Sequence, residues 1–583
     1  MMAHVTSRHT AVPANWARIS ETPWPLITVA PFTEPEPPTL ESSSAQIRAW
    51  VFYCDQRHGH FDSQKQDDDI PKLPTRLVDV GNASTPPRLH ISSNGQSGRY
   101  LALSHCWGSP EHMRAKTTRA NLNDHVDKLD FAMLPRTFQD AIMVARSLDI
   151  PYIWIDSLCI IQDSRDDWAL EASRMAQVYS GAYLTLAADY AANPTQGLFA
   201  SPRVCPRPRS FIQVDMAGNP HTIHVRRDRP DRPIDRKREM TWSCYSSESV
   251  SELNGRAWAL QERILSHRTV SFTNTELIWE CRQEGIRCSC GHDITEPFDG
   301  RTAFERLSYM TLSFGNLPAI DHELGRLWAA IVQDLASRRL TFAADRLPAM
   351  AGVASALPFP TSDYLAGLWK RVLRSTLLWT APNARHNEPL ETPPNARVSA
   401  AGAPTWSWAC LSVPVMFPCG KKQLEIDWVI HDCVCTPSTP NPDGPVSDGL
   451  LHVEGVLLPV SLSQKDEFKV DICVPVHNGD PGDSGSMAKP RGGATTLYFD
   501  AGMGGCEWKR PGSSYAPLVA AYLKLEFLEG LQGRHRDTPI ALILRQDTDG
   551  RKTTCWTRIG LAVLDSMEGE VVRKVGRQRV VIV

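Results

Sequence analysis

Two short apolar runs, residues 100–103 and 152–155, each end abruptly in polar or reactive side chains. These side chains are Ser104, His105, Cys106 and Trp107 after the first run, and Asp156, Ser157 and Cys159 after the second. Short apolar runs bounded in this way predict buried strands. Ligands of an α/β sheet bind beyond the carboxyl ends of its strands, so the two endings predict a cleft.

The segment between the two runs predicts a helix. It opens at Pro135, and a proline in the first turn is a common start signal. Its apolar residues follow the three, four and seven spacing of one helix face, and they are Phe138, Ala141, Ile142, Ala145 and Leu148. Strand, helix and strand in close succession predict parallel strands joined by a right-handed crossover.

A second helix follows the second strand. Ser164 stands three residues before Asp167, a capping pair that satisfies free N–H groups at a helix start. The stripe that we expect to face the core is Trp168, Ala172, Met175 and Tyr179. Gly181 ends the helix, and residues 182–188 return as a strand.

The rest of the chain suggests four regions. Residues 1–95 form a leader with a Pro/Ser-rich segment and one short helix over residues 45–54. The α/β domain covers residues 96–290, and we expect its Arg/Pro-rich insertion, residues 203–254, to be a solvated loop. Helices over residues 328–340 and 364–377 mark a middle region, 291–424, the second packing beside Trp406 and Trp408. Alternating patterns, including a hairpin with an Asp-Gly turn, predict a β-rich region over residues 425–583.

Composition narrows the class of protein. The chain of 583 residues has 62 Lys and Arg against 65 Asp and Glu, and this balance argues against a dedicated nucleic-acid binder. Its first residues lack the apolar core of a signal peptide, and no run approaches the length of a membrane span. Its 15 cysteines show no framework spacing, which favours a reducing, cytoplasmic location.

Three segments carry a resemblance to a known family. They read YLALSHCWG at residues 100–108, WIDSLCIIQ at 154–162 and RAWALQE at 256–262. In this order they resemble the heterokaryon incompatibility (HET) domain of filamentous fungi. The resemblance implies an effector of non-self recognition (vegetative incompatibility) and programmed cell death. It also implies a TIR/flavodoxin-like α/β fold, a parallel sheet flanked by helices. The sequence holds no P-loop motif and no repeat array, so we expect protein partners or self-association to activate it.

A distant relation between HET and TIR domains draws attention to Glu171. Enzymatic TIR domains cleave NAD with a glutamate in a W-x-x-E-like setting, which Trp168 and Glu171 resemble. A carboxylate beside the departing nicotinamide can stabilise an oxocarbenium-like ribose. In the alternative interpretation, Glu171 pairs with Arg174 or fixes the loop of Trp107. Whether the protein is an enzyme, with NAD as its substrate, stays open.

Other residues are candidates for the same site. Asp156 and His105 are further catalytic candidates. A strand-end acid such as Asp156 can bind a ribose hydroxyl, and in the alternative it caps the loop that carries Cys159 and Gln162. His105 can pair with Cys106 or Cys159 in a nucleophilic site, as in an α/β enzyme of metabolism. The residues expected to bind NAD are Ser104, Trp107, Arg256 and Gln261. The alternative for Arg256 and Gln261 is a polar network that holds the third segment against the first two.

A cysteine-rich stretch suggests zinc only weakly. Its four soft ligands are Cys281, Cys288, Cys290 and His292. Their spacing is not the paired spacing of ordinary zinc fingers, so we expect a fold without metal there.

Overall fold

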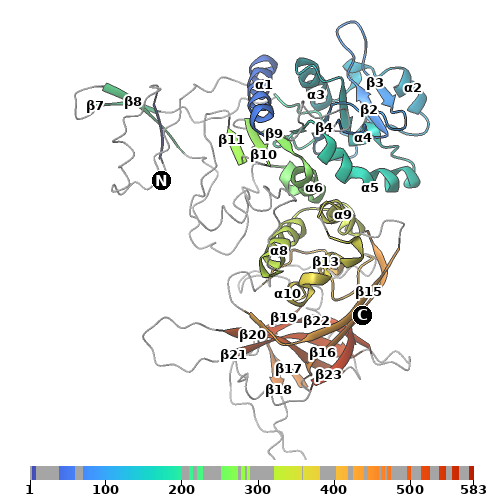
Figure 1. Ribbon diagram of the computed structural model, residues 1–583, viewed down its shortest axis with the longest axis vertical. Helices are drawn as coiled ribbons and strands as arrows, with labels where there is room; N and C mark the ends of the chain where they lie inside the picture. Colours follow the sequence, from blue (N-terminus) through green and yellow to red (C-terminus); the bar gives the residue numbers. More distant parts are fainter. Residues whose placement is uncertain are drawn as a thin grey trace, which may run out of the picture. The chain divides into compact units, whose positions relative to one another are not determined.

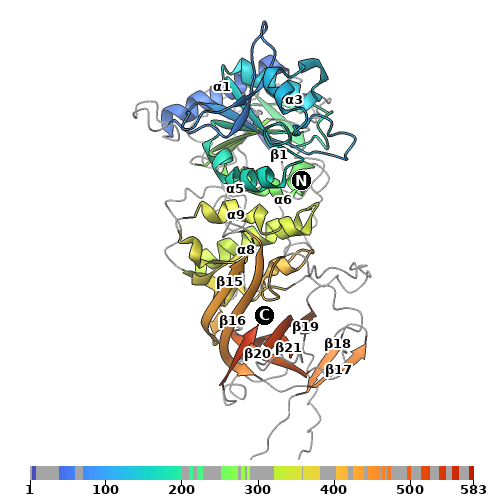
Figure 2. The ribbon, with the colours of Figure 1, turned by 90° about the vertical axis from the view of Figure 1, so that its right-hand side faces the viewer.

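The computed structural model describes residues 3–7, 39–58, 70–199, 209–214, 220–227, 251–273, 277–282, 285–288, 321–357, 359–380, 402–417, 424–438, 444–457, 461–466, 469–473, 496–499, 514–524, 537–546, 555–563 and 577–582. The chain divides into two compact units, Met1–Asn316 and Leu317–Val583. Figures 1 and 2 show their helices and strands from two directions.

The first unit is built on one mixed sheet with helices on both faces. Its described strands lie in the order β11-β10-β9-β6-β4-β5-β2-β3. In chain order these strands are β2 (Arg76–Asp79), β3 (Arg88–Ile91), β4 (Tyr100–Ser104), β5 (Tyr152–Ile155), β6 (Leu184–Ala187), β9 (Arg268–Phe272), β10 (Leu277–Cys281) and β11 (Gly285–Cys288). The helices are α1 (Leu40–Arg57), α2 (Leu122–Asp127), α3 (Arg136–Ser147), α4 (Asp156–Cys159), α5 (Arg165–Gly181) and α6 (Ala257–Leu265).

The centre of this sheet confirms the predicted α/β fold. Strands β5, β4, β6 and β9 lie side by side in this order and are parallel. The first of them along the chain, β4, therefore lies between β5 and β6. This is the doubly wound, flavodoxin-like order, and its switch point lies between β4 and β6. The outer strands β2, β3, β10 and β11 are antiparallel, so only the core of the sheet is parallel.

The helices cover the sheet as the doubly wound order requires. The predicted helix between β4 and β5 is α3, which follows Pro135 and buries Phe138, Ala141, Ile142 and Ala145. Figure 1 shows α1 and α3 on one face of the sheet and α5 and α6 on the other. The crossovers through α3 and α5 therefore lie on opposite faces.

One helix is turned differently from the prediction. Trp168 of α5 is 40% exposed and packs edge-on against Trp258 of α6, with ring centroids 6.5 Å apart. Met175 and Tyr179 of the predicted stripe are buried, and Glu171 rather than Trp168 lies on the same buried face. The predicted core stripe is therefore wrong at Trp168, because ion pairs to Arg76 hold the polar side of this helix against the sheet.

Two segments outside the predicted α/β core add to the first unit. The leader contributes strands β2 and β3, which join the sheet. It also contributes helix α1, which covers the sheet and is longer than the predicted short helix. The insertion contributes β7 (Arg209–Val214) and β8 (Pro220–Arg227), which form a small sheet with β1 (Ala3–Ser7). The predicted loop is wrong over these two strands, and the rest of the insertion up to residue 250 lies outside the described residues.

The second unit opens with helices α8 (Asp321–Ser337), α9 (Pro348–Ser355) and α10 (Leu373–Thr376). The helix predicted over residues 364–377 is wrong in its first part, which forms the small hairpin β12 (Tyr364–Leu365) and β13 (Leu368–Trp369). A tight turn separates them, because Ala366 and Gly367 both adopt positive φ. The Gly367 carbonyl accepts hydrogen bonds from the indoles of Trp328 and Trp408, so the predicted packing beside Trp408 is confirmed.

The β-rich region is confirmed in the remainder of this unit. Figure 2 shows its long neighbouring strands β15 and β16. Strands β21 and β22 pair antiparallel as the predicted hairpin requires, and the Asp-Gly turn lies outside the described residues. The strands are β14 (Leu424–Ile426), β15 (Val429–Pro437), β16 (Val446–Leu457), β17 (Ser461–Asp466), β18 (Lys469–Cys473), β19 (Thr496–Phe499), β20 (Ser514–Lys524), β21 (Asp537–Gln546), β22 (Cys555–Val563) and β23 (Arg577–Ile582).

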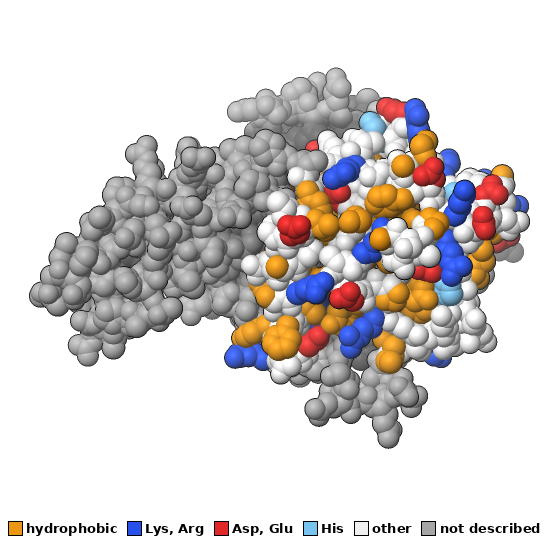
Figure 3. Space-filling view, turned by 90° about the horizontal axis from the view of Figure 1, so that it is seen from above, with side chains coloured by type: hydrophobic (Ala, Val, Ile, Leu, Met, Phe, Trp, Pro, Cys, Tyr) orange, Lys and Arg blue, Asp and Glu red, His pale blue; other side chains and the backbone are white. Residues whose placement is uncertain are grey.

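The surface of the described residues is mixed in character. Figure 3 shows acidic and basic side chains interspersed with apolar ones on the face in view, in line with the near balance of charge. Each helix that the structure describes is too short or too polar to cross a membrane.

Candidate functional site

Polar side chains gather where the parallel strands end. Ser104 closes β4 opposite Ala187 of β6, and Asp156 directly follows β5 on the other side of β4. The edge at which ligands bind in a doubly wound sheet therefore carries the residues that the sequence singled out.

Asp156 ties the loop after β4 to the end of β5. Its carboxylate accepts hydrogen bonds from the indole N–H of Trp107 and from the backbone N–H of Ser157, both at 2.7 Å. The other candidate acid–base group, His105, lies beside it, with 3.8 Å between Nδ1 and the carboxylate. Trp107 is thus held by Asp156, whereas the sequence had offered Glu171 as the residue that fixes this loop.

His105 is an unusual histidine. Its side chain is buried, and its ring packs edge-on against Phe138 of α3 with centroids 5.0 Å apart. Among the described residues, neither ring nitrogen makes a hydrogen bond of good geometry. Burial lowers the pKa of His105 to about 4, with Asp156 opposing the shift and Arg256 adding to it. The imidazole is therefore neutral at pH 7.

Glu262 of α6 reaches the same strand end from the opposite face of the sheet. Its buried carboxylate accepts a hydrogen bond from the Ser104 hydroxyl. Burial raises the pKa of Glu262 to about 7, although Arg256, Ser104 and the Tyr179 hydroxyl favour the charged form. This carboxyl can therefore exchange a proton near neutral pH.

Arg256 and Gln261 belong to the same helix region. The Arg256 guanidinium donates to the backbone carbonyl of His105, and its charge acts on Glu262. Gln261 is buried within α6. Contacts of Arg256 and Glu262 with the first segment form the polar network that the sequence offered as the alternative to ligand binding.

The two cysteines considered as partners of His105 are poor nucleophiles. Burial raises the pKa of Cys106 to about 11 and that of Cys159 to about 12. Both thiols are therefore protonated at neutral pH, and the thiolate is the reactive form. This argues against the Cys–His interpretation.

Glu171 lies in a different environment. Its Oε1 is 3.8 Å from both Arg76 Nη2 and Arg174 Nη1, so the predicted ion pair with Arg174 is present. Arg76 also donates to both oxygens of Asp167 and to the carbonyl of Cys159. Burial raises the pKa of Glu171, and a hydrogen bond from Thr75 and the charge of Arg76 oppose the shift. The contacts of Glu171 are thus with β2 and its own helix.

The metal candidates are dispersed or undescribed. Cys281 ends β10 and Cys288 ends β11, while Cys290 and His292 lie outside the described residues. The closest ligand-type neighbours of Cys281 in the described part of the chain are Cys54 and His58 of the leader.

The importance of Glu262 and Asp189 was not recognised from the sequence. Glu262 was quoted only as part of a segment, and Asp189 was not singled out at all. Asp189 follows β6 at the switch point, and its carboxylate accepts hydrogen bonds from Ser251 and Asn254 just before α6. The acid that ends the apolar run of residues 182–188 was the available signal.

The fold and this network define a doubly wound α/β domain with a polar cluster at its switch point. Residues 100–262 match the family model described as Heterokaryon incompatibility protein (HET), so the chain contains a HET domain. The match spans the whole cluster from Ser104 to Glu262 and supports a function of the heterokaryon-incompatibility type. No curated protein and no solved structure matches the chain.

Proposed function

We propose that this protein is a cytoplasmic effector of fungal non-self recognition, and that its HET domain triggers cell death when activated. The observation that carries the proposal is the meeting of three motif segments in one buried network. Ser104 comes from the first segment, Asp156 from the second and Glu262 from the third. Buried polar networks act as units, so each segment supports the action of the others.

Activation is proposed to need a protein partner or self-association. The burial of the network supports this step, since Ser104, His105 and Glu262 are each less than 5% exposed. Groups so deeply covered reach a substrate or a partner only after a rearrangement. Assembly that favours the rearranged state would serve as the switch.

A second candidate function is TIR-like cleavage of NAD by Glu171. The observation in its favour is a buried carboxyl whose pKa burial raises, a feature that concentrates at functional sites. The ionised form would stabilise an oxocarbenium-like ribose, as carboxylates do in glycoside hydrolysis. In this candidate Arg76 and Arg174 keep Glu171 charged, and Ser104, Trp107, Arg256 and Gln261 bind the dinucleotide.

A third candidate is a metabolic or tailoring enzyme on the same fold. A neutral imidazole beside a carboxylate, as in His105 and Asp156, suits general acid–base chemistry. Such an enzyme would depend on His105 while leaving NAD untouched and cells alive.

One experiment separates the three candidates. The full chain is expressed from an inducible promoter in a filamentous fungus, and survival and cellular NAD are followed together. Glu171→Gln keeps size and polarity but removes the charge, and Glu111→Gln is the matched control because Glu111 is exposed. Death with steady NAD in all three proteins supports the effector without NAD cleavage. NAD loss that Glu171→Gln alone abolishes supports the second candidate, and survival on full expression of the wild type contradicts the effector.

A further inference from the structure

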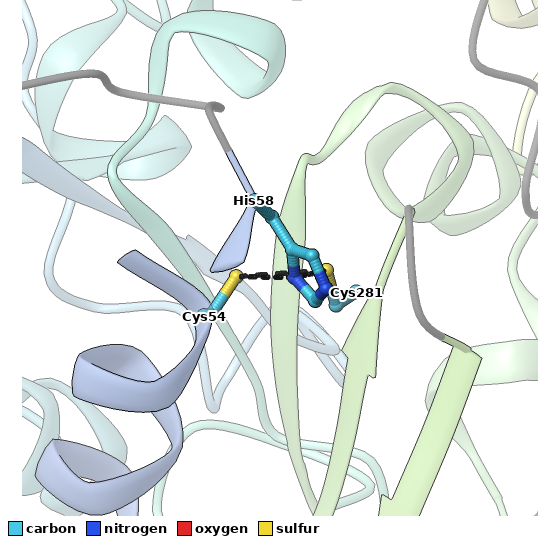
Figure 4. Close-up of side chains that lie close together, drawn as sticks. All are labelled: Cys54, His58 and Cys281. Carbon is cyan, nitrogen blue, oxygen red and sulfur yellow. Dashed lines mark hydrogen bonds between the residues drawn. The ribbon is translucent and has the colours of Figure 1, made fainter. Parts of the chain in front are cut away.

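Three soft ligands from distant parts of the chain converge beside α1. Cys54 lies in the last turn of α1, His58 caps its C-terminus, and Cys281 is the last residue of β10. Figure 4 shows the two sulfur atoms and the imidazole turned toward one another. The sulfur atoms of Cys54 and Cys281 are 3.6 Å apart, and His58 Nδ1 is 3.4 Å from each.

These separations match the edges of a tetrahedral zinc site. With Zn–S near 2.3 Å and Zn–N near 2.05 Å, tetrahedral ligands stand about 3.8 Å apart for two sulfurs and about 3.6 Å apart for sulfur and nitrogen. All three observed distances agree with these values to about 0.2 Å. Two thiolates and an imidazole form a ligand set that zinc prefers over calcium or magnesium.

The two elements that carry the cluster, α1 and β10, pack against each other. Cys54 and His58 are four residues apart, so both project from one side of the helix end. One turn earlier, the ring of Trp50 packs against Trp279 of β10 with centroids 6.0 Å apart. Trp279 stands two residues before Cys281 on the same strand, so the aromatic pair and the cluster share one face.

A buried cation stands beside the cluster. Arg268 of β9 donates to Asp55, which also accepts from the hydroxyl of Tyr183 at 2.7 Å. The Arg268 guanidinium also interacts with the Cys54 sulfur. The positive charge of Arg268 is thus placed to offset part of the negative charge of two metal-bound thiolates.

We propose that Cys54, His58 and Cys281 bind a zinc ion that fastens α1 to β10, with water or a further donor as the fourth ligand. The site joins residues that precede and follow the HET match at residues 100–262. It differs from the cysteine-rich stretch considered in the sequence, with which it shares only Cys281. The zinc site is independent of the proposed effector function, because it concerns the attachment of α1 to β10 and not the polar network of the three motif segments.

The test is metal analysis of the full chain purified under reducing conditions. Stoichiometric zinc is expected in the wild type and in Cys410→Ser, a control at a buried cysteine of the second unit. Cys281→Ser and His58→Ala should lose the zinc, and His58→Cys should retain it because a thiolate replaces the imidazole. Arg268→Met should weaken zinc affinity roughly 10–100-fold. Zinc retained in Cys281→Ser but lost in Cys288→Ser would overturn the proposal.

Cobalt binding to the wild-type chain tests the proposal even where a variant does not fold. Co²⁺ in the wild-type chain should show the visible bands of a tetrahedral site and a thiolate charge-transfer band, both abolished by added zinc. Since ligand thiols must lose protons, the bound metal should dissociate as the pH is lowered. A chain free of zinc that takes up neither metal, or a Cys54–Cys281 disulfide in freshly isolated protein, would contradict the site.

Discussion

The hydroxyl of Ser104 donates a hydrogen bond to the buried carboxylate of Glu262, which lies 158 residues further along the chain. This bond joins the end of β4 to α6 and therefore the first HET segment to the third. Because Arg256 also donates to the carbonyl of His105, two contacts hold the same pair of segments. The cluster is thus a property of the folded domain rather than of any one motif.

Stability should depend on pH through Glu262. Its pKa is raised in the folded protein to about 7, so the protonated form is favoured by folding. The resulting stability is present below pH 4.5 and is lost as the pH rises through 7. Relative to Glu262→Gln, the wild type should lose on the order of 3 kcal/mol of unfolding free energy over this window. Denaturant titrations at a series of pH values measure the difference, and parallel curves for the two proteins would refute the assignment.

Trp154 should be far more important for stability than Trp168. Trp154 is fully buried in β5, whereas Trp168 is 40% exposed on α5. Trp154→Ala should cost about 3–5 kcal/mol. Trp168→Ala should cost roughly 1 kcal/mol or less, because little buried area is lost. Thermal melting of both variants tests the orientation of α5, and equal losses would show that it is turned as the sequence suggested.

Arg76 should be a strong stabilising residue. Its guanidinium donates to Asp167 at 2.6 and 2.8 Å and lies 3.8 Å from Glu171 in a largely buried setting. Arg76→Met leaves both carboxylates without this cation, a change that typically costs about 3–5 kcal/mol. Arg88→Met is the matched control, since its pair with Asp79 is exposed and should contribute at most about 1 kcal/mol. Chemical denaturation at pH 7 compares them, and similar losses would mean that the Arg76 pair is solvated.

The sequence predicted the centre of the fold well and its edges less well. Strands β4 and β5 and helix α3 follow from local periodicity, because each buries one continuous apolar face. The antiparallel outer strands β2 and β10 pair with β5 and β9, and no local pattern in the sequence encodes these pairings. Trp168 shows the limit of counting apolar residues, since the ion pairs of Arg76 decide which side of α5 is buried.

The candidate site, like the fold, could be predicted from the sequence only in part. Ser104, His105, Trp107 and Asp156 could be predicted because they follow two apolar runs directly. A polar network between the third segment and the first two was one of the alternatives that the sequence offered. The individual partners of Arg256 and Glu262 could not be predicted, since α6 is brought to the strand ends by the fold and not by spacing. The neighbours of Cys281 were equally hidden, because Cys54 lies 227 residues away.

The most direct test of the central claim is survival of a fungal host after induction of Ser104→Ala and Glu262→Gln. Each change weakens the contact between the first and third segments, and Glu111→Gln serves as the control on the exposed surface of the same domain. Protein levels and melting temperatures are measured alongside, so that loss of folding is recognised. The account predicts that the wild type and Glu111→Gln kill the host while both cluster variants, folded and present at equal levels, let it survive. Killing by folded Ser104→Ala and Glu262→Gln at the rate of the wild type would contradict it.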